Sequence, residues 1–327
     1  MTRSAPGAEI PARRPGFSVS VLAKSLPFLL SSAILLHGGA PALAQTAAAP
    51  APSSGPSSIA EEKPLPELGP FLEDVRARLH SDEVLLDQYT FTERHTEREL
   101  DARGGVRKVK TETYEVYPSL EPGHTYRRLV EKDGRALDAR ELAAEDRKHE
   151  KKVTDDGSVE ELEKKRTARL AQSRQREESG VRQVFRIYNI AVAGREMLDG
   201  RPAIVVTFKP RPNVEVSGRA GRVLKSLAGR AWIDEEDRQL VRVDAELIDN
   251  LSFGLGVLAR LHKGSRASLL RRKVNGEIWL PALARFSGSA RLLLFKGLRL
   301  DALSEYSDYR KFQVATSTDI VVPEPSR

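Results

Sequence analysis

The six histidines are the residues of this chain best suited to metal or acid–base chemistry, and their spacing argues against a metal site. Zinc sites on helices use histidines four residues apart, often as His-Glu-x-x-His. Here every histidine stands alone, and we interpret each as a surface or strand residue. The five that follow the N-terminal segment are His80, His95, His124, His149 and His262. We predict no metal and no cofactor.

Nucleophile and phosphate-binding patterns are also missing from the sequence. No Gly-x-Ser-x-Gly turn occurs. Residues 218–226 resemble a phosphate-binding loop, but Leu224 stands where a glycine must precede Lys225. We expect this run to be a connection into a strand near Ala231. A pair of facing carboxylates, as in glycoside hydrolases, stays open because sequence alone does not place two acids together. We predict no catalytic residue.

Residues 1–44 have the composition of a secretory signal. Arg13, Arg14 and Lys24 precede an apolar run over 26–36, and Ala42-Leu43-Ala44 offers small residues for cleavage before Gln45. The apolar run has eleven residues, whereas a membrane-spanning helix needs about 20. We therefore predict a periplasmic protein that is at most peripheral to the membrane. The alternative is an uncleaved anchor.

The remaining chain divides by composition. Residues 45–66 are rich in Ala, Pro and Ser and predict a disordered linker, 67–315 a single β-rich domain, and 316–327 a flexible tail. The absence of cysteine excludes disulfides, so a packed core must hold the domain. Acids and bases are interleaved, and the net charge of +7 is partly in the signal, which argues against a nucleic-acid partner.

Apolar spacing predicts one helix at the start of the domain. Leu68, Leu72, Val75 and Leu79 lie at helical intervals, and we expect them to pack on a sheet. A second helical region is expected at 138–178, where acidic and basic residues are nearly balanced, with a break at Asp155-Asp156-Gly157. We interpret this insertion as a solvated helical excursion. The alternative is a lid or a partner-docking arm.

The rest of the domain predicts an antiparallel sheet. Runs at 89–100, 106–117 and 125–131 are followed by seven further candidates at 231–234, 239–248, 256–263, 268–273, 277–286, 289–296 and 298–308. Asp133-Gly134, Asp199-Gly200 and Asn275-Gly276 suit two-residue hairpin turns. Alternation predicts one apolar face that binds a ligand or forms the core. Its candidate residues are Val241, Val243, Ala245, Leu247, Leu280, Phe286, Leu292 and Leu294.

Several segments occur in an order that resembles a known family. They are the first helix followed by Tyr89-Thr90-Phe91-Thr92-Glu93, then Asp199-Gly200-Arg201-Pro202-Ala203, Gly229-Arg230-Ala231-Trp232-Ile233-Asp234, Asn275-Gly276-Glu277-Ile278-Trp279-Leu280-Pro281, and Tyr306-Ser307-Asp308-Tyr309-Arg310-Lys311-Phe312. The chain resembles the periplasmic outer-membrane lipoprotein-sorting (LolA-like) superfamily over roughly residues 68–315. The resemblance implies a mainly β (α+β) fold, in which a curved antiparallel sheet or half-barrel packs on the N-terminal helix.

That resemblance also implies a function. The family's cavity takes acyl chains of lipoproteins or other lipids, so a lipid or a lipidated protein is the expected partner and no catalytic activity is expected. One alternative is a cell-envelope sensor or protein-interaction module on the same fold, in which the charged insertion docks an envelope protein. A second alternative is a hydrolase. The length of this chain and its charged insertion depart from the compact carrier pattern.

Overall fold

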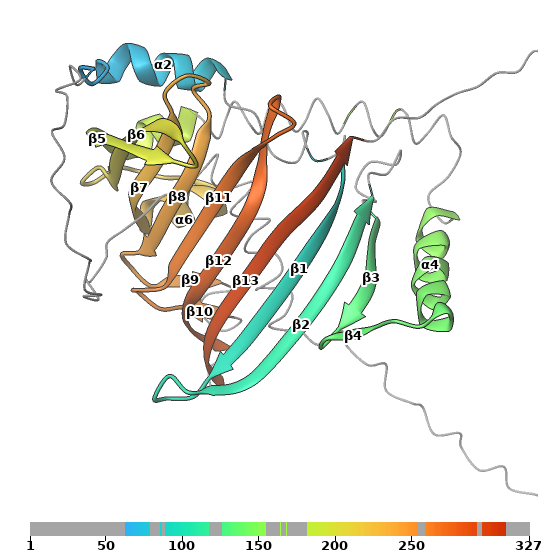
Figure 1. The fold of residues 1–327 in the computed structure, drawn as a ribbon. Coiled ribbons are helices and arrows are strands. Elements are labelled where there is room, and N and C mark those ends of the chain that lie inside the picture. The colour runs from blue at the N-terminus through green and yellow to red at the C-terminus, as the bar shows by residue number, and fades with distance from the viewer. Residues whose placement is uncertain are drawn as a thin grey trace, which may run out of the picture.

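The computed structural model describes residues 63–78, 86, 89–117, 126–154, 164, 168, 182–253, 259–292 and 296–311. A large, open and curved antiparallel sheet occupies most of this part, as the resemblance implied (Figure 1). Its strands are β1 Tyr89–Leu100, β2 Val106–Tyr117, β3 Tyr126–Lys132, β4 Arg135–Ala136, β5 Tyr188–Leu198, β6 Arg201–Pro210, β7 Leu227–Asp234, β8 Leu240–Leu247, β9 Leu251–Phe253, β10 Ala259–Leu261, β11 Arg266–Val274, β12 Ile278–Leu292 and β13 Lys296–Lys311. The helices are α2 Leu68–Arg78, α4 Ala139–Thr154 and α6 Gly218–Lys225.

The strand order shows which parts of the chain meet. It runs β4-β3-β2-β1-β13-β12-β11-β8-β7-β6-β5, and β10 pairs with β12 and β9. The last strand, β13, therefore lies between β1 and β12 and joins the N-terminal hairpins to the C-terminal ones.

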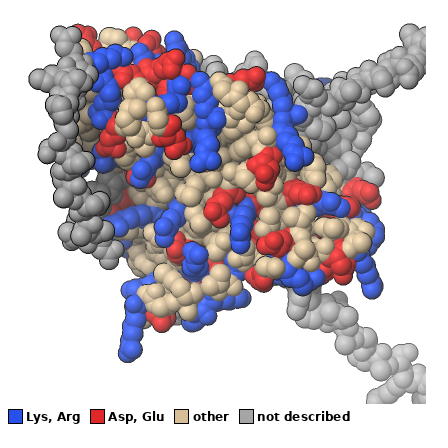
Figure 2. All heavy atoms as spheres, viewed as in Figure 1, with Lys and Arg blue, Asp and Glu red and all other residues tan. Residues whose placement is uncertain are grey.

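Figure 2 shows acidic and basic residues interspersed over the viewed face, with no large patch of a single charge.

The three predicted hairpin turns are confirmed. Asp133 and Gly134 have φ of 52° and 80°, Asp199 and Gly200 of 47° and 78°, and Asn275 and Gly276 of 52° and 71°. Two consecutive positive φ angles characterise the type I′ turn, which matches the twist of the strands that it joins. These dipeptides therefore fix the β3–β4, β5–β6 and β11–β12 connections.

Two sequence-based expectations for strands and loops are wrong. The separate strands expected at 277–286 and 289–296 form one strand, β12, which runs through Gly288. This glycine serves close packing rather than a turn, because an added Cβ would lie 2.4 Å from Ser265 Oγ. The connection expected at 218–226 is the helix α6, whose Leu224 is fully buried. The strand β9 was not predicted.

The main core lies on one face of the sheet, here called the inner face. It is the face on which Val206, Val243, Leu269 and Ala284 pack against α2 and α6. Phe71 and Val75 of α2 are 2% and 6% exposed, whereas Leu68 and Leu72 are only partly buried against the same cluster. Leu79 lies outside the described residues. The predicted docking of the first helix is therefore confirmed, with Phe71 as its main anchor.

The charged insertion begins with α4, which lies beside β3 (Figure 1). Asp138 and Glu141 form a reciprocal capping box, in which each backbone N–H donates to the other's carboxylate at 2.8–2.9 Å. Arg128 of β3 donates two hydrogen bonds to Asp146 of α4, and the rings of Tyr126 and His149 stack at 4.1 Å. The expected break at 155–157 lies outside the described residues.

Candidate functional site

The inner face carries several of the residues that the sequence assigned to ligand binding. Val241, Val243, Ala245 and Leu247 of β8 are 3–5% exposed and alternate with half-buried residues, as predicted. Val243 packs in the cluster under α2 and α6. Leu247 and Phe286 pack in a second apolar cluster, which continues onto β13. The structure therefore brings together the β8 and β12 parts of the predicted face.

Of the other three candidates, Leu280 does not lie on this face, and the side chains of Leu292 and Leu294 are not described. A register shift between β11 and β12 follows Leu270, because Leu270 pairs with Leu283 and Arg271 with Pro281. The extra residue reverses the alternation, so Leu280 lies on the face opposite Ala284 and Phe286, although it is fully buried. Leu292 pairs with Lys296 at the end of β12. Leu294 lies outside the described residues.

Several members of the inner face were not singled out from sequence. Leu269 of β11 lies between Val243 and Ala284 in the sheet register, and Leu298, Leu300 and Ala302 of β13 complete the second cluster. The alternation of Leu298, Leu300 and Ala302 along β13 was the sequence signal that could have identified these three residues. Together these residues make an apolar strip from β6 to β13, formed by two neighbouring clusters of the inner face.

Beside this strip the same face carries a row of buried polar residues, and a third apolar cluster of Phe91, Tyr114 and Val116 lies next to that row. Ala284 of β12 is opposite Ser304 of β13, Ser304 is opposite His95 of β1, and His95 is opposite Glu112 of β2. His95, Ser304 and Glu112 are only 2%, 1% and 6% exposed. The Nδ1 atom of His95 lies 3.0 Å from Ser304 Oγ. His95 is thus a strand histidine, as predicted, but it belongs to a buried polar row that the sequence did not reveal.

Glu112 is held by two neighbours on its own strand. Tyr114 donates its hydroxyl to Glu112 Oε2 at 2.8 Å, and Lys110 Nζ lies 2.7 Å from Oε1. Burial and this hydrogen bond raise the pKa of Tyr114. Arg127 of β3 lies over the Tyr114 ring and pairs with Glu93 at 2.6 Å. In the described part of the chain, no three metal-ligating side chains form a group suited to a metal ion.

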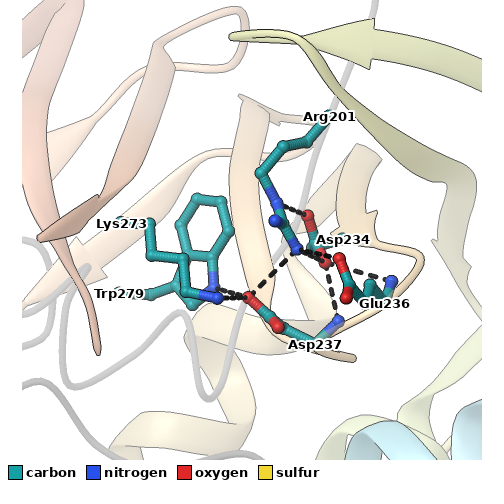
Figure 3. A network of polar contacts seen from close by, with 6 residues as sticks. All are labelled: Arg201, Asp234, Glu236, Asp237, Lys273 and Trp279. Carbon is teal, nitrogen blue, oxygen red and sulfur yellow. Dashed lines mark hydrogen bonds and ion pairs between the residues drawn. The ribbon is translucent and has the colours of Figure 1, made fainter. Parts of the chain in front are cut away.

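A second polar network lies at one end of the sheet and has a structural role (Figure 3). Arg201 donates two hydrogen bonds to Asp234 at 2.7 and 2.9 Å, and Asp234 also accepts the backbone N–H groups of Glu236 and Asp237. Trp279 donates its indole N–H to Asp237 at 2.8 Å. Three segments that carry the family resemblance therefore meet here, which fixes β6, the β7–β8 turn and β12 together.

The two tryptophans do not contribute to the apolar strip. Trp232 packs with Ala203 and Val205, whose neighbours along β6 point to the inner face, so Trp232 lies on the opposite face. Its indole N–H donates to Glu196, and Arg230 and Arg242 lie over its ring. Trp279 belongs to the network around Asp237. Both tryptophans therefore serve packing and hydrogen bonding within the fold.

Comparisons with known proteins give structural matches alone. No family model matches the chain, and no curated protein matches its sequence. A LolA superfamily protein from Nitrosomonas europaea is 10% identical, covering 75% of this chain and 93% of that chain with a TM-score of 0.27. A domain described as an outer membrane lipoprotein-sorting protein, from Vibrio parahaemolyticus, is 9% identical, covering 74% and 91% with a TM-score of 0.27.

A third match is the MucA/MucB complex of Pseudomonas aeruginosa, at 11% identity, 75% coverage of this chain, 99% of that chain and a TM-score of 0.20. The first two matches fall in the superfamily that the sequence resembles. With identities of 9–11% and TM-scores of 0.20–0.27, the functional case rests on this chain's own residues. In the described residues we find no helix with the length and hydropathy of a membrane span.

Proposed function

We propose that this chain is an exported, non-catalytic binding protein that holds an acyl chain, from a lipid or a lipidated protein, against its inner face. The observation that carries the proposal is the apolar strip on that face, whose two clusters extend over many strands of the sheet. Signal cleavage before Gln45 would deliver it to the periplasm, where such ligands are available.

The energetics of acyl burial fit a strip of this kind. Each buried methylene contributes about 0.8 kcal/mol, so a long chain gains enough to exceed the cost of association. The site would open by displacement of α2, because Phe71 and Val75 cover one of the two clusters.

A fluorescent fatty-acid probe tests this proposal directly. We expect saturable binding to the mature protein that unlabelled palmitate competes away, and lipid that co-purifies and is detected by mass spectrometry. Ala245→Trp fills the strip and should weaken binding at least about tenfold. Ala193→Trp, at an exposed position of β5, is the matched control and should leave binding within about twofold.

Thermal melts of both variants separate lost binding from lost folding, and palmitate competition on the unmodified protein does not depend on either variant. If no probe binds at high micromolar concentration and nothing co-purifies, the strip is only a core and the proposal is wrong.

The second candidate is a protein-interaction module in the cell envelope. The favouring observation is α4, which is fixed beside β3 by Arg128 and Asp146 while Arg147, Lys148 and Lys151 are exposed. A photo-crosslinker at Lys151 should then capture one envelope protein in cells, and a crosslinker at Arg272, an exposed position of β11 in the middle of the sheet, should not. Equal capture from both positions would count against it.

A further inference from the structure

The two edge strands of the sheet differ in what pairs with them and covers them. At one edge, β4 pairs with Glu131 and Lys132 of β3, and α4 is attached by the two hydrogen bonds from Arg128 to Asp146. At the other edge lies β5, which among the described strands pairs only with β6. One edge is therefore covered, and among the residues that the structure describes no strand or helix covers the other.

The hydrogen bonds of β5 show which backbone groups face the open side. Arg211 N donates to Ile187 O at 2.7 Å, and the Thr207 hydroxyl donates to Ala191 O at 3.4 Å. In an antiparallel pair, every second residue directs its backbone N–H and C=O groups toward the neighbouring strand, so those groups of Ala191 face β6. Ile190 and Val192 then present their N–H and C=O groups outward, where no described group bonds them.

The side chains of this stretch do nothing to prevent another strand from pairing. Asn189, Ala191 and Ala193 are exposed, and residues 188–194 include neither a charge nor a proline. Natural edge strands usually avoid pairing through lysines, prolines, inward charges or bulges. The register shift between Val192 and Gly194 is such a bulge, and it limits the open stretch to the first half of β5.

Positive charge surrounds this open stretch. Arg186, Lys209 and Arg211 are all exposed. Arg186 donates to the backbone oxygen of Glu215 at 2.9 Å, and Arg211 to that of Tyr188 at 3.2 Å. Both guanidinium groups therefore bond neutral carbonyls at these contacts, and their charge is available to carboxylates of a partner.

We propose that the first half of β5 is a docking edge for an extended, acidic segment of a partner protein. The segment adds as a further strand, with backbone hydrogen bonds to Ile190 and Val192 and with its carboxylates near Arg186, Lys209 and Arg211. Backbone pairing supplies affinity in this mode, and the flanking charges supply selectivity. This goes beyond acyl binding, because it uses the edge of the sheet and not its inner face.

A synthetic peptide with three glutamates followed by alternating threonine and valine tests the proposal in the mature protein. We expect saturable binding by fluorescence anisotropy and slower amide hydrogen exchange at Ile190 and Val192. Ala191→Glu should raise the Kd at least about tenfold through charge repulsion. Val109→Glu is the control, because Val109 is 51% exposed and lies on β2, which is not an edge strand. This substitution should change the Kd by less than about twofold.

Three results would overturn the proposal. The first is an exchange rate at Ile190 and Val192 that the peptide does not change. The second is equal binding of a peptide with lysines in place of the glutamates, which would show that Arg186, Lys209 and Arg211 do not select an acidic segment. The third is concentration-dependent dimerisation that Ala191→Glu abolishes, which makes a second copy of the chain the occupant of this edge.

Discussion

His95 and Ser304 face each other across β1 and β13, with Nδ1 and Oγ 3.0 Å apart and both side chains almost fully buried. They stand where the apolar strip of the inner face ends, between Ala284 on one side and Glu112 on the other. Burying polar groups is unfavourable unless they are hydrogen-bonded, so this pair helps to fix the register at the centre of the sheet.

Ser304→Ala should lower the free energy of unfolding by about 1–3 kcal/mol, because it removes a buried hydrogen bond to His95. Ser307→Ala, at an exposed position of the same strand, is the control and should cost less than about 0.5 kcal/mol. Urea denaturation measures both. Equal effects of the two substitutions would show that the buried bond contributes nothing measurable.

Phe71→Ala should destabilise the domain by about 3–5 kcal/mol, since Phe71 is 2% exposed and belongs to the main cluster. Leu72→Asp should also destabilise it, because it brings a charge to a position that packs against that cluster. Glu73→Ala, on the exposed side of α2, serves as the control. A thermal-melt shift no larger than that of Glu73→Ala would mean that α2 is not docked.

The Arg195–Glu235 pair predicts a dependence of stability on pH. Hydrogen bonds from Arg195, at 2.7 and 3.0 Å, lower the pKa of Glu235 against the effect of burial. A lowered carboxyl pKa stabilises the fold above the unfolded value of about 4.3, and this contribution is lost as the pH falls through the folded value.

The difference in unfolding free energy between the wild type and Arg195→Gln should therefore be large at neutral pH and shrink progressively below about pH 4. Arg272→Gln is the control, because Arg272 and Asp199 lie 3.7 Å apart and are both mostly exposed. Chemical denaturation at a series of pH values measures it. A difference that is the same at every pH would contradict the assignment to Glu235.

Deleting the charged insertion, by joining Ala136 to Gly180 through a short glycine linker, should leave a soluble and cooperatively folded domain. The helix α4 of the insertion contacts the sheet through hydrogen bonds from Arg128 of β3 and Arg135 of β4 and through the stacked rings of Tyr126 and His149. Removing α4 uncovers the β3 edge, so we expect weak self-association by sedimentation. Loss of soluble protein would show that the insertion packs into the core.

Mature protein from the periplasm should begin at Gln45, because Ala42-Leu43-Ala44 presents small residues to a signal peptidase. N-terminal sequencing measures this. Replacing Ala44 with a bulky residue should slow processing, whereas a change at Leu43 should not. Mature protein that retains residues 1–40 would favour the uncleaved anchor.

Local sequence determined the hairpins and much of the alternation by itself. A two-residue type I′ turn needs two positive φ angles, and Asp-Gly and Asn-Gly adopt them at low cost, so Asp199-Gly200 marked its turn without help from the rest of the chain. Alternation in β8 likewise marked Val243 and Leu247 as inner-face residues, because successive side chains in a strand point to opposite faces.

Tertiary structure alone decided the rest. An extra residue in β12, opposite Leu270 and Arg271, turns Leu280 to the face opposite the one predicted. Such a bulge is a property of a pair of strands, so the sequence of one strand does not show it. His95 and Ser304 are 209 residues apart, so their contact exists only once β13 lies beside β1. The open edge of β5 has the same origin, because a strand is an edge only in relation to the order of all the others.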